Sequence, residues 1–217
     1  MYFILGGGVI INMWDTISKA WQTAFELAWE AFINSSIPIG AVIVDENNDI
    51  ISSGRNRLYE KDILHPKIAH AEMEALQKLD FAKYPGYTYT LYTTMEPCPM
   101  CFGTIVMSNI RTLRIAARDG YCGALHLREK DQYIASKNIK ATFEHGVLET
   151  VQLAMQTYFE LKARNGEMNR VTSVFERDNS IAVEIAKSLY SEKLLDRYVE
   201  NKTPFSELFN EIIKRSK

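Results

Sequence analysis

Two short stretches of the chain carry side chains that together could perform chemistry. His70 and Glu72 lie two residues apart, and Cys98 and Cys101, three apart, follow later in the sequence. One imidazole and two thiolates are ligands that zinc accepts in proteins, and three protein ligands leave one position open for water. A carboxylate beside that water could carry its proton. The sequence therefore predicts a catalytic zinc site divided between these two stretches.

Each stretch stands where a helix is expected to begin. Cys98 and Cys101 share the first turn of one helix, so their thiols face the same way, and the positive end of that helix favours thiolate over thiol. His70, at the start of another helix, would supply the third ligand. Glu72 points in a different direction from His70, which suits a proton carrier better than a fourth ligand. Zinc lowers the pKa of bound water from about 15.7 to about 7.

Each half of the motif also has another interpretation. A lone Cys-x-x-Cys suits structural zinc or a redox pair. A redox pair has no use for the upstream His-x-Glu, and a structural zinc site would need a fourth protein ligand. The candidates for that ligand are Cys122, His65, His126 and His145. The two stretches together favour catalysis.

Composition and charge describe an ordinary globular protein. The chain has 217 residues, 47% hydrophobic and 24% charged, which is enough for one well-buried core. A net charge of −2 gives no overall attraction to nucleic acid. Three cysteines, two of them in one Cys-x-x-Cys, do not form a disulfide framework and favour a reducing, cytoplasmic location. The apolar opening is too short to span a membrane, so we expect no membrane association.

Around the two stretches, strands alternate with helices. Helical spacing of apolar residues runs from Asp15 or Thr16, either of which would cap the helix, to about Asn34. The expected strands are residues 41–44, 50–54, 87–94, 113–117 and 141–144, and the first two form a hairpin. The other expected helices are residues 70–79, 99–108 and 149–164. This alternation indicates an α/β layered domain with helices on both faces of a mixed sheet.

Two boundaries divide the chain into three parts. Residues 1–12 include three consecutive glycines, and we interpret them as a mis-assigned start ahead of a native Met13, or as a disordered leader. Residues 13–165 form the zinc domain. Residues 166–217 form a helical C-terminal appendage.

The C-terminal appendage has its own helical pattern. One helix is expected around residues 181–190, capped by Asp178 or Asn179. Thr203-Pro204 would open another, because proline is favourable at the first helical position. We expect this appendage to pack on the core or on a partner subunit.

The two stretches also carry a family resemblance. His70-Ala71-Glu72 followed by Pro97-Cys98-Pro99-Met100-Cys101 resembles the zinc nucleobase deaminases of the cytidine and deoxycytidylate deaminase superfamily. Further motifs resemble bacterial tRNA adenosine deaminases and their nucleoside-deaminase relatives, over about residues 14–165. These motifs are Pro38-Ile39-Gly40-Ala41-Val42, Gly54-Arg55-Asn56-Arg57, Thr94-Met95-Glu96-Pro97-Cys98 and Ala117-Arg118-Asp119.

The resemblance implies a fold, a reaction and a set of contacts. The fold is a three-layer α/β/α sandwich around a five-stranded mixed sheet, and a homodimer is expected. The reaction is hydrolytic deamination of a nucleobase ring, with Zn2+ activating water and Glu72 shuttling protons until ammonia leaves. Asn56 matches a position that hydrogen-bonds the base, and the backbone of Ala71 lies beside the same pocket. For Asn56 alone, a turn asparagine after a strand is the other interpretation.

The substrate is the least determined part of the function. Tyr158-Phe159 resembles the aromatic pair in the last helix of tRNA deaminases, but the basic run that follows there is weaker here, reading Glu160-Leu161-Lys162-Ala163-Arg164. The loop before His70 also departs from the tRNA deaminase pattern. A phosphate-binding patch could come from Arg111, Arg114, Arg118, Arg128 and Lys130, or these could be plain solvated charges.

We expect a free nucleoside or nucleobase as the substrate. A tRNA-specific adenosine deaminase is the alternative. A non-catalytic zinc-binding interaction module is the alternative of another class. The choice of base is expected to lie in the loops of residues 55–69 and 118–126.

Overall fold

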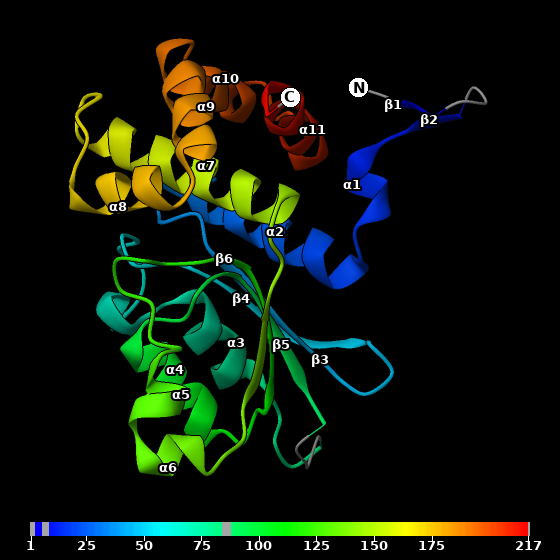
Figure 1. Ribbon diagram of the computed structural model, residues 1–217, viewed down its shortest axis with the longest axis vertical. Coiled ribbons are helices and arrows are strands. Elements are labelled where there is room, and N and C mark those ends of the chain that lie inside the picture. Colours follow the sequence, from blue (N-terminus) through cyan, green and yellow to red (C-terminus); the bar gives the residue numbers. More distant parts are fainter. Residues whose placement is uncertain (1–2, 6–8, 84–87, 217) are drawn as a thin grey trace.

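A five-stranded mixed sheet lies between two layers of helices in this computed structural model, which describes residues 3–5, 9–83 and 88–216 (Figure 1). The strands follow the order β4-β3-β5-β6-β7 across the sheet. β3 pairs antiparallel with β4 and β5, whereas β5, β6 and β7 run parallel. Their bounds are Gly40–Val44 (β3), Ile50–Arg55 (β4), Thr90–Met95 (β5), Thr112–Ala117 (β6) and Lys140–Phe143 (β7). The predicted three-layer fold is confirmed.

Strand β3 shows why a strand of this sheet has a continuous run of apolar residues in the sequence. All five of its residues are buried, and they alternate between the two faces. Ala41 and Ile43 belong to the hydrophobic cluster on one face, and Val42 and Val44 to the cluster on the other. A strand covered by helices on both sides therefore needs apolar residues at every position.

Helices α3 (Ala71–Lys78) and α4 (Pro99–Met107) cover the first face, and both begin at the predicted chemical stretches. Phe102 and Ile105 of α4 pack with Leu76 of α3 and with the inward residues of the strands. Two short helices that the sequence did not predict, α5 (Leu127–Lys130) and α6 (Gln132–Ala135), follow β6.

Helices α2 (Lys19–Ile33) and α7 (Val147–Ala163) cover the second face. The prediction that Asp15 or Thr16 caps one long N-terminal helix is wrong. A separate short helix, α1 (Met13–Thr16), precedes α2, and Ile17 between them is extended. The Ser18 hydroxyl accepts a hydrogen bond from the Trp21 N–H at 3.4 Å, so serine caps α2.

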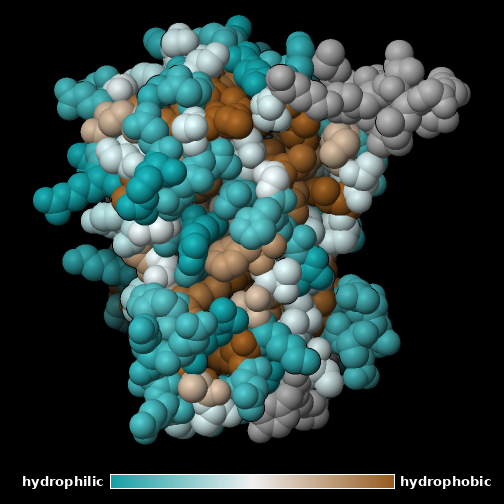
Figure 2. All heavy atoms as spheres, in the orientation of Figure 1, coloured by the Kyte–Doolittle hydropathy of each residue, from teal (hydrophilic) through white to brown (hydrophobic). Residues whose placement is uncertain are grey.

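Four helices make up the C-terminal region: α8 (Arg170–Asp178), α9 (Ser180–Ser191), α10 (Leu194–Glu200) and α11 (Phe205–Arg215). The sequence predicted α9, with Asn179 among its two candidate caps, and α11, but neither α8 nor α10. Pro204 precedes α11 as its cap residue, not its first helical residue. Figure 2 shows hydrophobic residues between these helices and the helices below them in the view. Most of the visible surface around them is hydrophilic.

The C-terminal helices complete the core on the α2–α7 face. Phe205 of α11 lies with its ring centroid 5.4 Å from Trp14 and 6.0 Å from Phe25, and Phe209 packs beside it. These rings belong to the same buried cluster as the inward residues of α2 and α7. Of the two expected locations for this region, packing on the core is the one observed.

The N-terminal residues pair as β1 (Phe3–Leu5) and β2 (Val9–Ile11), which are antiparallel. The prediction of a native start at Met13, or of a disordered leader, falls partly outside the described residues and stays a prediction. Within the described parts of the chain, no helix has the length and apolar character that a membrane span requires.

Gly54 in β4 lets α3 approach the sheet closely. A Cβ atom added there would lie 2.5 Å from the Ala75 backbone nitrogen and would also collide with the Ala71 carbonyl. We therefore expect Gly54→Ala to lower the free energy of unfolding by about 1–3 kcal/mol, as overpacking does. Urea denaturation would measure the change.

Gly103 in α4 provides the matched control. An added Cβ there meets no atom within 4 Å, so Gly103→Ala is expected to be neutral or to raise stability by about 0.5–1 kcal/mol. Wild-type stability of Gly54→Ala would contradict the close seating of α3 on β4.

Candidate active site

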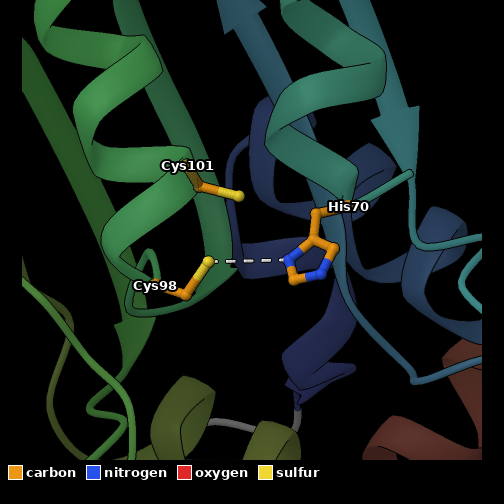
Figure 3. A group of neighbouring side chains, drawn as sticks. All are labelled: His70, Cys98 and Cys101. Carbon is orange, nitrogen blue, oxygen red and sulfur yellow. Dashed lines mark hydrogen bonds between the residues drawn. The ribbon is translucent and has the colours of Figure 1, made fainter. Parts of the chain in front are cut away.

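Three predicted ligands converge from the starts of two helices. The His70 ring, Cys98 and Cys101 have ligand atoms that all lie within 4.8 Å of one another. Figure 3 shows the three side chains meeting between α3 and α4, with Cys98 Sγ 3.7 Å from His70 Nδ1. Two ligands of one tetrahedral zinc ion, each about 2.0–2.3 Å from it, are themselves about 3.5–3.8 Å apart. The group therefore fits zinc.

The local sequence explains where each ligand stands. Cys98 is the cap residue of α4, and Pro99 follows it at the first helical position, where its missing N–H costs nothing. Cys101 then falls in the first turn. His70 caps α3 with an extended backbone, and its N–H donates to the Ile68 carbonyl at 2.9 Å, in the short 3-10 turn Pro66–Ile68.

Hydrogen bonds within the group polarise the two thiols. The hydrogen bond from Cys101, assisted by His70, lowers the pKa of Cys98 to about 4, although burial opposes it. The same hydrogen bond with Cys98, and then burial, raise the pKa of Cys101. The hydrogen bond with Cys98 also raises the pKa of His70. Zinc binding would therefore release protons from Cys101 and His70.

In zinc-free protein, iodoacetamide is expected to alkylate Cys98 almost as fast at about pH 6 as at neutral pH, because its thiolate is lost only as the pH falls through about 4. Burial and the nearby Asp119 raise the pKa of Cys122, so Cys122 should react only in alkaline solution. Peptide mass spectrometry measures both rates. Zinc should protect Cys98, and identical pH profiles for the two cysteines would contradict this expectation.

Glu72 is buried beside the ligand group. Its Oε1 atom lies 3.3 Å from the Thr93 hydroxyl, which is also 3.0 Å from the Met95 carbonyl. Burial, and then the charge on Cys98, raise the pKa of Glu72. A carboxylate with a raised pKa accepts a proton more readily than an ordinary one.

Asn56 keeps one side-chain donor free. Its Oδ1 accepts hydrogen bonds from the Ser36 hydroxyl at 3.0 Å and the Leu58 N–H at 2.9 Å. The hydrogen bond from the Leu58 N–H is the one that a turn asparagine makes, which is the other interpretation of this residue. Its Nδ2 group is buried without a protein partner, and such a donor is costly unless a ligand supplies an acceptor. Both interpretations of Asn56 are compatible with these contacts.

Ala71 is the fully buried first residue of α3. The N–H groups of a first helical turn have no acceptor within their own helix. The contact between the Ala71 backbone and a bound base, which the resemblance implies, stays a prediction.

The proposed fourth ligands do not join the group. Among the described residues, the metal-competent cluster consists of His70, Cys98 and Cys101 alone. Cys122 donates its S–H to Asp119 Oδ2 at 3.1 Å. A structural zinc site would need a fourth protein ligand, so the arrangement favours an open coordination position.

Glu96 supports the cysteine loop, and sequence reasoning assigned it no role. Its carboxylate accepts hydrogen bonds from the Leu125 N–H at 3.1 Å and the Asp119 N–H at 3.3 Å. The Ala124 N–H donates to the Pro97 carbonyl at 3.0 Å. These bonds fasten loop 118–126 to the segment that carries Cys98. In the sequence, only the position of Glu96 just before Pro97 pointed to this supporting role, because its hydrogen-bond partners are more than twenty residues away.

Known proteins share this fold and these motifs. Residues 15–117 match the family model described as the cytidine and deoxycytidylate deaminase zinc-binding region. A cytosine deaminase of Candida albicans is 30% identical over 149 residues, which cover 67% of this chain and 86% of that protein. A tRNA-specific adenosine deaminase of Haemophilus influenzae is 34% identical over 158 residues, covering 70% and 88%.

Solved structures agree with these sequence matches. A structure from a study of A-to-I editing by tRNA:A34 deaminases aligns with a TM-score of 0.50 and 29% identity, covering 57% of this chain and 95% of the other. A guanine deaminase from Nitrosomonas europaea aligns with a TM-score of 0.52 and 24% identity, covering 64% and 82%. The second similarity supports the fold alone.

Proposed function

Because the chain belongs to the family of zinc-dependent cytidine and deoxycytidylate deaminases, we propose that it removes the ring amino group of a free nucleobase or nucleoside. His70, Cys98 and Cys101 would hold the zinc ion, which lowers the pKa of a bound water to about 7. The products would be the corresponding ring carbonyl and ammonia.

Glu72 would act as the proton carrier. A C–O bond forms at the amino-bearing carbon and the C–N bond breaks. Of the two protons of the attacking water, one ends on the ring nitrogen beside the new carbonyl, and the other leaves with the amine as ammonia. The buried Glu72 carboxylate would take the proton that leaves with the amine and deliver it, and its raised pKa favours the uptake.

Two groups would orient the base. The unpartnered Asn56 Nδ2 would donate to an acceptor atom on the ring, and the Ala71 backbone would lie beside the same pocket. A site built to hydrogen-bond a substrate rejects analogues that leave its buried polar groups unpaired. This pairing would help to select the base.

Two cations near the end of α7 have carboxylates beside them, and this observation favours a free nucleobase or nucleoside over tRNA as the substrate. Lys162 Nζ lies 2.5 Å from Asp196 Oδ1 of α10, and Arg164 Nε lies 3.9 Å from Glu160 Oε2. These cations occupy the positions of the basic run in the tRNA deaminase motif. Each of these exposed cations has a carboxylate beside it, which lowers the net positive charge that this helix end offers to a phosphate backbone.

Three of the four arginines of the predicted phosphate patch have internal partners, and the fourth, Arg118, is 67% exposed and lies 4.0 Å from Glu96. Arg114 forms an ion pair with Glu144. The Arg111 guanidinium donates to the Val106 carbonyl at 3.2 Å, near the end of α4. The Arg128 guanidinium donates to the Leu125 carbonyl at 3.3 Å. These contacts favour a structural use of the three side chains.

A tRNA substrate is the second candidate, because aromatic rings lie near the end of α7. Tyr59, 60% exposed, stacks on Phe159 with ring centroids 6.1 Å apart. Both line a cavity of about 560 Å³. Exposed aromatic rings can stack with unpaired bases.

Ammonia release from zinc-loaded protein would test the proposal. The panel contains cytosine, cytidine, adenine, adenosine and guanine, beside an anticodon stem-loop with adenosine at position 34. We expect release from a free base or nucleoside, with little dependence on salt. Release from the RNA alone, falling steeply with salt, would establish the second candidate. No release from any of them would favour a non-catalytic zinc module.

Assembly and location belong to the same proposal. On the family resemblance we propose a homodimer in the cytoplasm. Analytical ultracentrifugation would test the dimer, and a monomer at micromolar concentration would contradict it.

A further inference from the structure

We propose that Glu60 is a positioning residue for the base, acting through Asn56. Its carboxylate lies where the side chains on both sides of Asn56 converge. The inference rests on the proposed function, since the contact between Asn56 and the base comes from there.

Arg55 and Arg57 flank Asn56, and both bind Glu60. Arg57 Nε lies 2.8 Å from Glu60 Oε2, and Arg55 donates from NH1 to Oε1 and from NH2 to Oε2 at 3.5 Å. Strand β4 ends at Arg55, and the chain then enters a turn. The Arg55 guanidinium also donates to the Asn56 carbonyl at 3.4 Å. Because Glu60 binds the side chains on both sides of Asn56, it limits how far the backbone of Asn56 can rotate.

Backbone hydrogen bonds extend this clamp to the zinc site. The Glu60 N–H donates to the Arg57 carbonyl at 3.1 Å, which closes the turn. The Arg57 N–H donates to the carbonyl of Ala69 at 2.8 Å, one residue before His70. The backbone of Arg57 therefore connects the turn that carries Asn56 to the segment that precedes His70.

Glu60 differs from the other carboxylates that bind these arginines. Its side chain is 12% exposed and receives both guanidinium groups, whereas Glu30 binds Arg55 at 54% exposure and Asp62 binds Arg57 at 72% exposure. Glu74 is also partly buried, at 14% exposure, but it lies 3.9 Å from Arg57 and contacts that arginine without Arg55. Exposed ion pairs contribute little. A partly buried carboxylate shared by two arginines holds its geometry more firmly.

Other hydrogen bonds hold Asn56 and its turn, including one from the Tyr59 N–H to the Ser36 hydroxyl at 3.2 Å. Asn56 Oδ1 already binds Ser36 and Leu58, and the Asn56 N–H donates to the Ile39 carbonyl at 2.9 Å. These bonds hold the residue in its turn, but the turn itself closes through residues 57–60. Without Glu60, Arg55 and Arg57 would turn to their outer partners and the loop would open.

The test compares Glu60→Gln with Glu30→Gln and Asp62→Asn in the full-length, zinc-loaded protein. On the best substrate of the panel, we expect Glu60→Gln to raise KM about tenfold, with kcat and zinc content close to wild type. Glu60→Asp should recover part of the loss. The two control variants, which remove the outer partners of the same arginines, should leave KM within about twofold.

A double mutant separates positioning from general destabilisation. In an Asn56→Ala background, Glu60→Gln should raise KM no further, because its effect passes through Asn56. An equal rise in both backgrounds would overturn the inference. A wild-type KM for Asn56→Ala would instead overturn the base contact in the proposed function.

Hydrogen exchange gives a measurement that needs no turnover. Glu60→Gln should speed exchange of the Arg57 and Leu58 amides, and Glu30→Gln should not. Unchanged exchange in Glu60→Gln would overturn the positioning role, whatever the protein deaminates.

Discussion

Glu72→Gln is expected to lower the rate of ammonia release by about 10²–10⁴-fold, the contribution of a positioned acid–base group, while zinc stays bound as in wild type. Glutamine keeps the shape of the side chain and the contact with the Thr93 hydroxyl, 3.3 Å away. It cannot take a proton from water. The measurement is steady-state ammonia release together with zinc content by mass spectrometry.

The same substitution should not weaken the fold. Burial raises the pKa of Glu72, so the ionised carboxylate reduces stability progressively as the pH rises above its normal pKa, and a neutral amide removes that cost. Glu46→Gln, at a solvent-exposed turn, is the matched control and should keep full activity. Full activity of Glu72→Gln would instead support a non-catalytic zinc module.

Cys101→Ala is expected to remove most of the zinc and, with it, the activity. Cys101 is fully buried, and its thiol is one of only three ligand groups brought together in the described residues. Two remaining ligands hold zinc poorly, because protein zinc sites use three or four. Zinc per chain after dialysis against a weak chelator measures the loss.

Cys122→Ala is the control for Cys101→Ala. Cys122 hydrogen-bonds Asp119 and stands outside the ligand group, so its removal should leave zinc content unchanged. Zinc loss from Cys122→Ala, or full zinc in Cys101→Ala, would show that the metal site has different ligands.

The sequence predicted the parts of the site that depend on local rules. Pro99 and the spacing of Cys98 and Cys101 define a helix start within one turn, and α4 begins at the predicted residue, Pro99. The continuous apolar run of residues 41–44, followed by the strand expected at residues 50–54, predicted the hairpin of β3 and β4. These features need no knowledge of distant partners.

Features that depend on distant contacts were not predictable. The partners of Glu96 lie in another loop, and Glu60 depends on how two arginines turn after β4. Helix α8 presents only Phe175 and a few partly buried apolar residues to the core. Its pattern is too sparse to distinguish it from a polar loop.

The aromatic contact between α11 and the first helices has a consequence for biosynthesis. Phe205 packs on Trp14 and Phe25, and Phe209 contacts the same two rings. Roughly 170 residues separate α2 from α11 along the chain. At about 5–20 residues per second, a ribosome needs roughly ten to thirty seconds to make them. During that time the nascent chain exposes tryptophan and phenylalanine side chains, so its yield in cells should depend on chaperones that shield them.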